Sequence, residues 1–442
     1  MTDCITSILE FNPLKGRKVE ASFSGGAITS DGGILLLREA EKGIKLLDKV
    51  SKAIPDHRDQ SKITHSIKTM LEQRVYGIAL GYEDLNDHKT LRKDISLQVA
   101  VNATGDLASS PTLCRFENQA TKQVAFDMHK AMIDQFIESR RETPEELILD
   151  FDATDDLVHG NQVGRFFHGY YGNYCFLPLY VFCGRHLLVS FLRPSNKDGA
   201  RGAWAILSKL VKRFRKEWPN VRIIFRGDSG FCRHEMFDWC ERNDVYYITG
   251  IATNKCIERI FKPKIEEAKK CFEETQEKQR IFSEFMYGAQ TWSKERRIIG
   301  KAEHTADGAN PRFIVTNLPG EPQELYDDCY CARGDMENRI KEQQLDLFAD
   351  RTSCHDWWPN QFRLILASLA YNLIEYLREF TLKETELATA QAGTIRLKLF
   401  KIGAVILKNT RRIVFKLSSH YPYQPLFEKI WQRLTKTVLD ST

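Results

Sequence analysis

The sequence predicts an α/β fold, because short apolar runs typical of strands alternate with amphipathic segments typical of helices through its middle. The strand-like runs are 147–151, 176–182, 187–192, 221–225 and 245–251, and the helical segments are 201–218 and 235–243. Cys-Gly-Arg, between the second and third runs, is a hairpin signal. The resulting order, βββαβαβ, predicts an antiparallel hairpin extended by parallel crossover units.

A chain of 442 residues is too long for one typical domain. The expected parts are a helical N-terminal region, a core in two pieces, an inserted β-rich subdomain between them, and a basic C-terminal segment. The helical N-terminal region spans 1–140, and the basic C-terminal segment spans 386–442. The two pieces of the core span 141–251 and 326–385, with the inserted subdomain at 252–325 between them.

The N-terminal region carries apolar residues at helical spacing over 34–47, 63–80 and 85–101. A further helix begins at Ser110, where serine precedes proline, and it presents Arg115 on a polar face. Short helices, a turn and a polar-faced helix are compatible with a helix-turn-helix reader of DNA, although most three-helix stretches do not read DNA. Arg115 is the candidate DNA contact in this region.

The C-terminal segment is the most basic part of the chain. Residues 391–442 hold ten Lys and Arg and two Asp and Glu, a net of +8, which leaves −3 for the rest of a chain whose total is +5. This asymmetry indicates a polyanion partner, with an ordinary solvated surface as the alternative. Arg411 and Arg412, beside a strand-like alternation over 412–417, are the candidate DNA contacts.

Other features narrow the class of protein. The 11 cysteines include no CxxC pair, which favours free thiols in a reducing cytoplasm over a structural zinc site.

No apolar run reaches the ~18 residues of a membrane span, and the N-terminus does not resemble a signal peptide. The expectation is a cytoplasmic protein. His159, His168 and His234 show no spacing typical of a zinc or iron hydrolase.

Three acidic positions carry the candidate chemistry, and the first lies in LILDFDATDD. Asp150 and Asp152 are two residues apart, so on a strand they share one face. Burying a carboxylate costs several kcal/mol unless a cation or hydrogen bonds compensate it, so acids on an apolar strand favour a metal site. The alternative is a loop in which aspartate caps a following helix.

The second acid is Asp228, in IIFRGDSGF, where an apolar strand again runs into a carboxylate. The flanking glycines allow a sharp turn and close approach of a substrate. Ligands of open α/β sheets bind beyond the carboxyl ends of strands, where both Asp152 and Asp228 fall. Two acids at neighbouring strand ends are suited to bind a divalent cation.

The third acid is Glu337, in YCARGDMENRIKEQQ. Tyr330, Arg333, Glu337 and Lys341 follow one another at steps of three, four and four, so on a helix they line one face. An acid on such a stripe can bind a metal while its neighbours bind phosphate oxygens. Ordinary ion pairs on a solvated helix are the alternative.

A nearby aromatic cluster has two interpretations. It comprises Phe166, Phe167, Tyr170, Tyr171 and Tyr174. These rings could stack on unpaired bases, but packing between subdomains is the preferred interpretation.

Three acids in the order strand, strand, helix on a βββαβαβ frame resemble the arrangement of ribonuclease H-like nucleases and integrases. The chain resembles the DDE transposases of bacterial insertion sequences, in particular family 1380. The phrases that carry the resemblance span nearly the whole chain and include DGGILLLREA, PTLCRFEN, LDFDATDD, RGDSGFCR, KAEHTADGANPRF and YCARGDMENRIKEQQLDLFADRTSCH.

The resemblance implies a divalent-metal-dependent DNA transposase with a ribonuclease H-like core and Asp152, Asp228 and Glu337 as its metal-binding catalytic triad. In related families the third acid lies in a Tyr-x2-Arg-x3-Glu-x6-Lys signature. Tyr330, Arg333 and Glu337 match it, whereas Gln344 occupies the lysine position and Lys341 lies one turn closer. The first acid of such families precedes x-Thr, which favours Asp152 and leaves Asp150 as a supporting residue.

The resemblance also implies Mg²⁺ as cofactor, with Mn²⁺ as a substitute, and double-stranded DNA, both transposon ends and target, as partner. A DNA-bound homodimer acting on the bacterial nucleoid is expected, with Tyr330, Arg333 and Lys341 contacting DNA. A metal-dependent nuclease without strand transfer, or a DNA-binding protein that no longer cuts, is the alternative.

Overall fold

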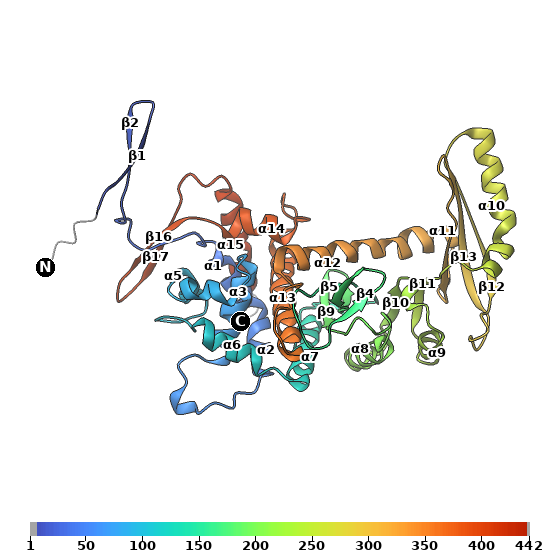
Figure 1. The fold of residues 1–442 in the computed structure, drawn as a ribbon, viewed down its shortest axis with the longest axis horizontal. Coiled ribbons are helices and arrows are strands. Elements are labelled where there is room, and N and C mark those ends of the chain that lie inside the picture. Colours follow the sequence, from blue (N-terminus) through green and yellow to red (C-terminus); the bar gives the residue numbers. More distant parts are fainter. Residues whose placement is uncertain (1–6, 440–442) are drawn as a thin grey trace. The chain divides into compact units, whose positions relative to one another are not determined.

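The computed structural model describes residues 7–439, which form two compact units (Figure 1). Unit 1 comprises residues 7–119, 346–348 and 369–439, and unit 2 comprises 120–345 and 349–368. None of the helices within 7–439 combines the length and apolar character needed to cross a bilayer. The ten cysteines of this part of the chain are free thiols.

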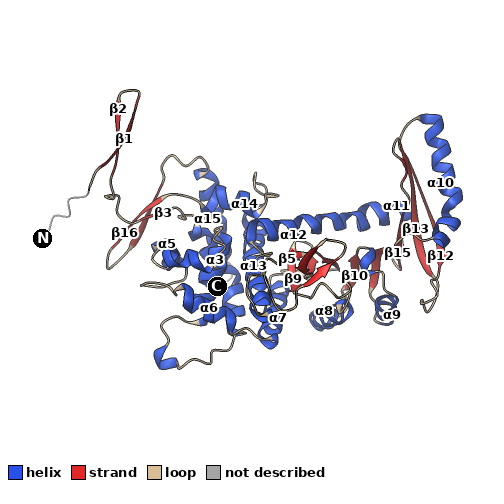
Figure 2. Cartoon of the chain, in the orientation of Figure 1, coloured by secondary structure: helices blue, strands red, loops and turns tan. Residues whose placement is uncertain are grey.

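Unit 2 is built on a nine-stranded mixed sheet in the order β12-β13-β15-β11-β10-β4-β8-β9, with β14 paired to β13 (Figure 2). Its strands are β4 Glu146–Ala153, β8 Leu179–Cys183, β9 His186–Phe191, β10 Arg222–Gly227, β11 Tyr246–Gly250, β12 Gln279–Tyr287, β13 Arg296–Thr305, β14 Gly308–Ala309 and β15 Arg312–Thr316. Strands β4, β10 and β11 are mutually parallel, whereas β8 runs antiparallel to both of its neighbours, β4 and β9. A mixed α/β architecture is therefore confirmed.

Helices cover this sheet because their apolar residues recur at helical spacing. In α8 the buried side chains are Leu207, Leu210, Val211 and Phe214, one face of a 3.6-residue period. Beneath them, Phe151 of β4 and Phe225 of β10 pack edge to face with ring centroids 5.0 Å apart. The helices of unit 2 are α7 Lys122–Glu138, α8 Ala203–Glu217, η3 Ser229–Phe231, α9 His234–Arg242, α10 Lys255–Thr275, α11 Pro322–Glu324, η4 Leu325–Tyr330, η5 Cys331–Arg333, α12 Gly334–Leu347 and the first part of α13 Trp357–Leu377.

The strands expected to form a separate inserted subdomain belong instead to the large sheet. β15 pairs with β11 on one side and with β13 on the other, so the sheet continues without a break. Four of the five residues of β15 are buried, because Phe313 and Val315 pack in one hydrophobic cluster and Ile314 packs in another on the opposite face. Phe261 of α10 packs on Phe313 of β15, 5.2 Å between centroids, and so attaches the charged helix to this part of the sheet.

A small sheet, ordered β5-β7-β6, completes unit 2 with β5 Asp156–Leu157, β6 Phe166–His168 and β7 Asn173–Phe176. Helix α7, expected in the N-terminal region, also belongs to unit 2. Its His129 is buried and its imidazole nitrogens lie 2.8 Å from Ala125 O and 3.1 Å from Ser190 O of β9. Because β9 is an edge strand, this contact satisfies a backbone group that the sheet leaves unpaired.

Unit 1 combines helices with two small sheets. The helices are α1 Ile34–Ile44, α2 Leu46–Lys52, η1 Gln60–Lys62, α3 Ile67–Ala79, η2 Leu85–Asp87, α4 His88–Leu91, α5 Ile95–Ala100, α6 Ser110–Asn118, the last part of α13, η6 Arg378–Leu382, α14 Ala392–Ile395, η7 Arg396–Phe400 and α15 Gln424–Leu439. A hairpin pairs β1 Leu9–Leu14 with β2 Arg17–Ala21, and a three-stranded sheet has the order β17-β16-β3, from Ile413–Leu417, Ala404–Lys408 and Ile28–Thr29.

Two helices that the sequence predicts as continuous are interrupted. The segment 34–47 breaks at Lys45, which adopts a left-handed conformation with φ 55° and separates α1 from α2. The segment 85–101 breaks before α5, where the Asp94 carboxylate accepts hydrogen bonds from the backbone N–H groups of Ser96 and Leu97. Such an N-terminal cap starts a new helix and ends the previous one.

A buried carboxylate makes the stability of unit 1 depend on pH. Glu41 of α1 is 5% exposed, and its Oε1 accepts from the Asp48 backbone N–H at 3.0 Å, whereas Oε2 has no hydrogen-bond partner within 7–439. Burial raises the pKa of Glu41 to about 8 and that of Glu72, on α3, to about 7. The folded state therefore favours protonated Glu41 more than the unfolded chain does.

We expect Glu41→Gln to remove part of this pH dependence. Because the folded-state pKa is raised, the contribution of Glu41 is fully present below pH 4.5 and is lost as the pH rises through about 8. Denaturant titrations at pH 5 and pH 9 should show a loss of stability that is smaller by roughly 3–5 kcal/mol in the variant, which keeps the part due to Glu72. Glu39→Gln, on the same helix, is the control, and equal pH profiles for Glu41→Gln and the native protein would refute the assignment.

Candidate active site

The end of β4 carries two aspartates with different environments. Asp150 is 1% exposed, and both of its oxygens are bound by Arg226 of β10, with Nη2 donating to Oδ2 at 2.7 Å and Nε to Oδ1. Arg226 also donates to the backbone carbonyl of Cys329. Asp150 is therefore engaged in a buried ion pair that ties β4 to β10 and to the segment before α12.

Asp152 lies two residues further along β4 and is only partly buried, with 14% of its side chain exposed. Its Oδ1 accepts from the Ala153 N–H at 2.9 Å. In the parallel pairing of the two strands, Gly227 of β10 is the partner of Phe151. Asp152 and Asp228 each come one residue after this pair, so Asp152, near the carboxyl end of β4, and Asp228, directly after β10, lie at the same edge of the sheet.

Asp228 begins a tight turn. Its Oδ1 accepts from the Gly230 N–H at 2.9 Å and caps η3, while Gly227 packs against the ring of Phe231. A β-carbon on Gly227 would lie 3.0 Å from Phe231 Cβ, so the glycine allows the turn to fold tightly.

Arg333, at the end of the segment before α12, links Asp152 to a third carboxylate, that of Glu337 on α12. Arg333 Nη1 lies 3.3 Å from Asp152 Oδ2, and Nη2 donates to Glu337 Oε1 at 2.9 Å. Tyr330 precedes it by one turn, and its hydroxyl packs over Gly250 at the end of β11. A β-carbon on Gly250 would lie 2.6 Å from Tyr330 Oη, so this close approach requires glycine.

The charges of this cluster influence one another. The pKa of Asp152 is raised to about 7, mainly by burial and to a smaller degree by the negative charges of Asp228 and Glu337, while Arg333 opposes the rise. For Arg333, burial acts to lower the pKa, but the nearby acids, Asp152 foremost, outweigh it and the pKa is raised. Burial also raises the pKa of Tyr330, which keeps its phenol protonated. Asp228 and Glu337 thus both lie within electrostatic range of Asp152.

The donor set is that of a hard divalent cation, because it offers carboxylate oxygens and a partly buried site with excess negative charge. As they stand, no three His, Cys, Asp or Glu side chains within 7–439 are arranged to hold a metal ion. The guanidinium of Arg333 lies between Asp152 and Glu337 and balances their charge. If Arg333 turned away, a divalent cation between Asp152 and Glu337 would balance the charge of these carboxylates in its place.

The remaining predicted DNA contacts lie elsewhere. Lys341 is exposed on α12, and Gln344, at the lysine position of the signature, donates to the Asp155 carbonyl at 3.0 Å. Arg115 is exposed on α6 of unit 1, with Nη2 3.2 Å from Thr112 Oγ1. Arg411 and Arg412 form the exposed turn between β16 and β17, where their N–H groups donate to Asn409 Oδ1.

The aromatic cluster does not pack between subdomains as preferred from the sequence. Four of its rings are exposed, with Tyr170 at 87% and Phe167 at 57%. Burial raises the pKa of Tyr171 to about 12, and the negative charges of Asp155 and Asp152 add to the rise. This hairpin of β6 and β7 therefore borders the acidic cluster. The sequence identifies the aromatic residues of this hairpin, but their position beside Asp152 follows only from the fold.

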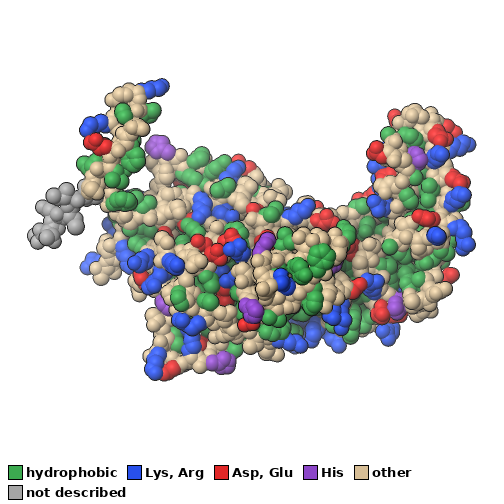
Figure 3. All heavy atoms as spheres, in the orientation of Figure 1, with side chains coloured by type: hydrophobic (Ala, Val, Ile, Leu, Met, Phe, Trp, Pro, Cys, Tyr) green, Lys and Arg blue, Asp and Glu red, His purple; other side chains and the backbone are tan. Residues whose placement is uncertain are grey.

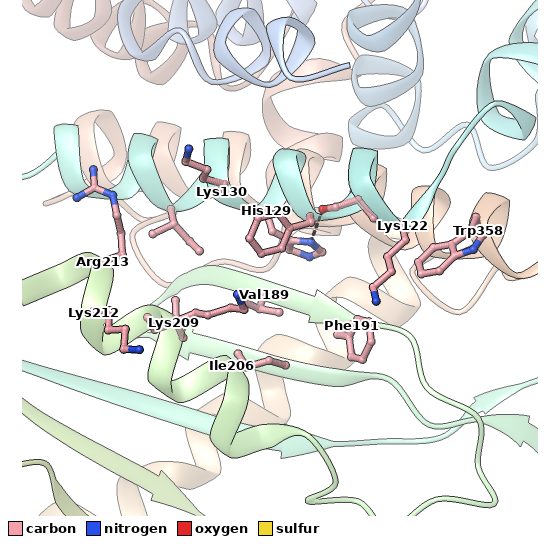
Figure 4. A pocket seen from close by; sticks show the side chains of 14 residues that line it. Lys122, His129, Lys130, Val189, Phe191, Ile206, Lys209, Lys212, Arg213 and Trp358 are labelled. Atoms are coloured by element: carbon pink, nitrogen blue, oxygen red, sulfur yellow. Dashed lines mark hydrogen bonds between the residues drawn. The ribbon is translucent and has the colours of Figure 1, made fainter. Parts of the chain in front are cut away.

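A separate apolar groove of about 410 Å³ lies between α7, β9 and α8 (Figure 4). Phe126, Phe191 and Ile206 line it, and Lys122 and Lys209 stand on its rim. The ammonium of Lys209 lies 5.0 Å from the centroid of the Phe126 ring. None of the predicted site residues lines this groove, so it is distinct from the acidic cluster.

A comparison with protein families identifies the family of this chain. Residues 11–439 match the family described as transposase DDE domain group 1, so the chain belongs to that family. The comparison with curated proteins gives no match. Among solved structures, a similarity is found to the piggyBac transposase in a synaptic complex with hairpin DNA, with a TM-score of 0.42 and 9% identity. It covers 92% of this chain and 84% of that one.

Proposed function

We propose that this DDE transposase cleaves DNA at transposon ends and joins them to target DNA by divalent-metal-dependent phosphoryl transfer. Asp152, Asp228 and Glu337 are its metal-binding triad. The observation that carries the proposal is the guanidinium of Arg333, which lies between Asp152 and Glu337, together with Asp228 directly after the adjacent strand β10. Membership of family 1380 of the insertion-sequence transposases is part of the same proposal.

A ribonuclease H-like core is supported by the middle of the large sheet. The order β9-β8-β4-β10-β11, with β8 antiparallel to both β9 and β4 and with β10 and β11 parallel to β4, follows from the strand pairings. Helices α8 and α9 provide the two crossover connections. This is the βββαβαβ order of that fold, and it places the first two acids at adjacent strand ends.

Mg²⁺ suits the all-oxygen donor set, and Mn²⁺ can substitute for it. Two such ions, when bound, activate an attacking water or DNA 3′-hydroxyl and stabilise the leaving oxygen. The chain's own contribution is positional: β4, β10 and α12 each hold one carboxylate. Arg333 is then free to turn from Asp152 and Glu337 toward a DNA phosphate, which a guanidinium binds in bidentate fashion.

Double-stranded DNA, as transposon ends and as target, is the proposed partner, and a homodimer is the proposed DNA-bound form. Tyr330, Arg333 and Lys341 contact DNA next to the triad. Arg115, Arg411 and Arg412 contribute phosphate contacts from unit 1, and such contacts fix position without reading sequence. The setting is the bacterial cytoplasm, at the nucleoid.

The test is a strand-transfer assay with the full chain, Mg²⁺, a supercoiled target plasmid and duplexes ending in the inverted repeats that flank the gene. We expect joined products that require both the repeats and the metal. Cleavage without joining would identify a nuclease instead, and DNA binding without either reaction would identify a protein that no longer cuts. Each of these two results would contradict the proposed function.

A further inference from the structure

The β1–β2 hairpin is an arm of unit 1 whose described residues, from 7 to 27, are exposed (Figure 1). Its turn is tight, with positive φ at Lys15, 50°, and Gly16, 81°. Two-stranded hairpins are only marginally stable in water by themselves. An arm of this kind, formed but uncovered, indicates a binding partner.

The two faces of the arm differ. Phe11 pairs with Val19 and Leu9 with Ala21, so these side chains share one apolar face. Glu10 pairs with Glu20 on the opposite face, and Lys18 lies 3.5 Å from each of their carboxylates. Exposed ion pairs of this kind contribute little to stability. The hairpin is thus amphipathic, with its apolar face available to a partner.

The tip of the arm is basic. Lys15 and Arg17 form no ion pair with any residue of the described chain, and Leu14 beside them is 65% exposed. The space-filling view shows hydrophobic side chains along the arm and basic ones at its end (Figure 3). Cations next to apolar side chains at the end of a β-ribbon complement the phosphates and sugars of a DNA groove.

A second basic hairpin shares a sheet with the strand that follows the arm. Ala27 O, just before β3, accepts from Ile406 N of β16 at 2.8 Å, and β3 then pairs with β16. The β16–β17 turn carries Arg411 and Arg412. Only six residues separate β2 from β3. The arm is therefore joined by a short link to the sheet of unit 1 that carries this turn.

We propose that the β1–β2 arm is a DNA-binding ribbon that inserts its tip into a groove of duplex DNA, with Lys15 and Arg17 on the phosphates. The proposal rests on DNA being the partner, as in the proposed function, and adds a contact made by two strands of the N-terminal region instead of by its helices. Charge complementarity at the tip favours DNA over a second copy of the chain.

The test measures binding of the full chain to a labelled duplex in EDTA. The titration is repeated at salt concentrations from about 50 to about 300 mM, so that the number of released counterions can be derived. We expect Lys15→Gln/Arg17→Gln to weaken binding about tenfold near 100 mM salt and to reduce the log–log salt slope by about 1.8, the release expected for two phosphate contacts. Lys264→Gln/Lys269→Gln, with the same charge change on exposed α10, should behave as the native chain.

A second variant, Phe11→Ser/Val19→Ser, addresses a protein partner through light scattering. If the tip variant leaves affinity and salt slope unchanged, the inference is overturned, whether or not the apolar-face variant alters the oligomeric state. In that case the proposed function still stands, provided the native chain binds the duplex. If the native chain shows no salt-dependent DNA binding at all, both the inference and the proposed function fail.

Discussion

Asp152→Asn and Asp228→Asn are each expected to reduce end cleavage by more than about 1,000-fold while DNA binding is retained. Asparagine preserves the shape of the side chain but removes a charge that holds the metal. Asp228→Asn keeps an oxygen to accept from Gly230 N–H, so the turn at η3 should remain folded. Cleavage of labelled end duplexes and binding in EDTA, measured on the same preparations, separate the two effects.

The matched control is Asp127→Asn, the same change at a partly exposed position of α7. It should cleave as the native chain does. A variant at Asp152 or Asp228 that still cuts in Mg²⁺ at a rate near that of the control would remove the residue from the triad.

Asp150→Asn is expected to act on the fold instead. Breaking a buried ion pair by neutralising one partner leaves the other charge uncompensated and costs about 3–5 kcal/mol. Here Arg226 would lose its counter-ion between β4 and β10, where its side chain is 8% exposed. Denaturant unfolding should show the loss for Asp150→Asn and little or none for Asp152→Asn.

The pair of variants also decides which aspartate binds the metal. Cleavage by Asp150→Asn, measured at a temperature where the variant is folded, should be reduced far less than that of Asp152→Asn. The opposite ranking, with Asp150→Asn stable and inactive, would exchange the roles of the two residues.

The sequence predicts the strands of the core well, because β4, β8, β10 and β11 are short apolar runs bounded by turn residues. It also places Asp152, Asp228 and Glu337 at two strand ends and on a helix face. It does not predict that Arg226 engages Asp150, because that contact depends on the register of two strands 76 positions apart. Periodicity alone cannot provide such a register.

Two other features depend on tertiary structure. The strands of 252–325 look like a separate β-rich unit in sequence, and only the pairing of β15 with β11 shows that they extend the core sheet. Similarly, the aromatic residues from Phe166 to Tyr174 read as a packing cluster, yet their exposure and the closeness of Tyr171 to Asp152 are visible only in the folded chain.

The most direct test of the triad is Mn²⁺ binding measured by electron paramagnetic resonance on the full chain with an end duplex. The account predicts that the native chain and Asp127→Asn bind Mn²⁺ with equal affinity. It also predicts that Asp152→Asn, Asp228→Asn and Glu337→Gln each weaken binding at least about tenfold, as loss of an anionic oxygen ligand requires. Unchanged Mn²⁺ affinity in all three variants would contradict the central claim that these carboxylates hold the metal.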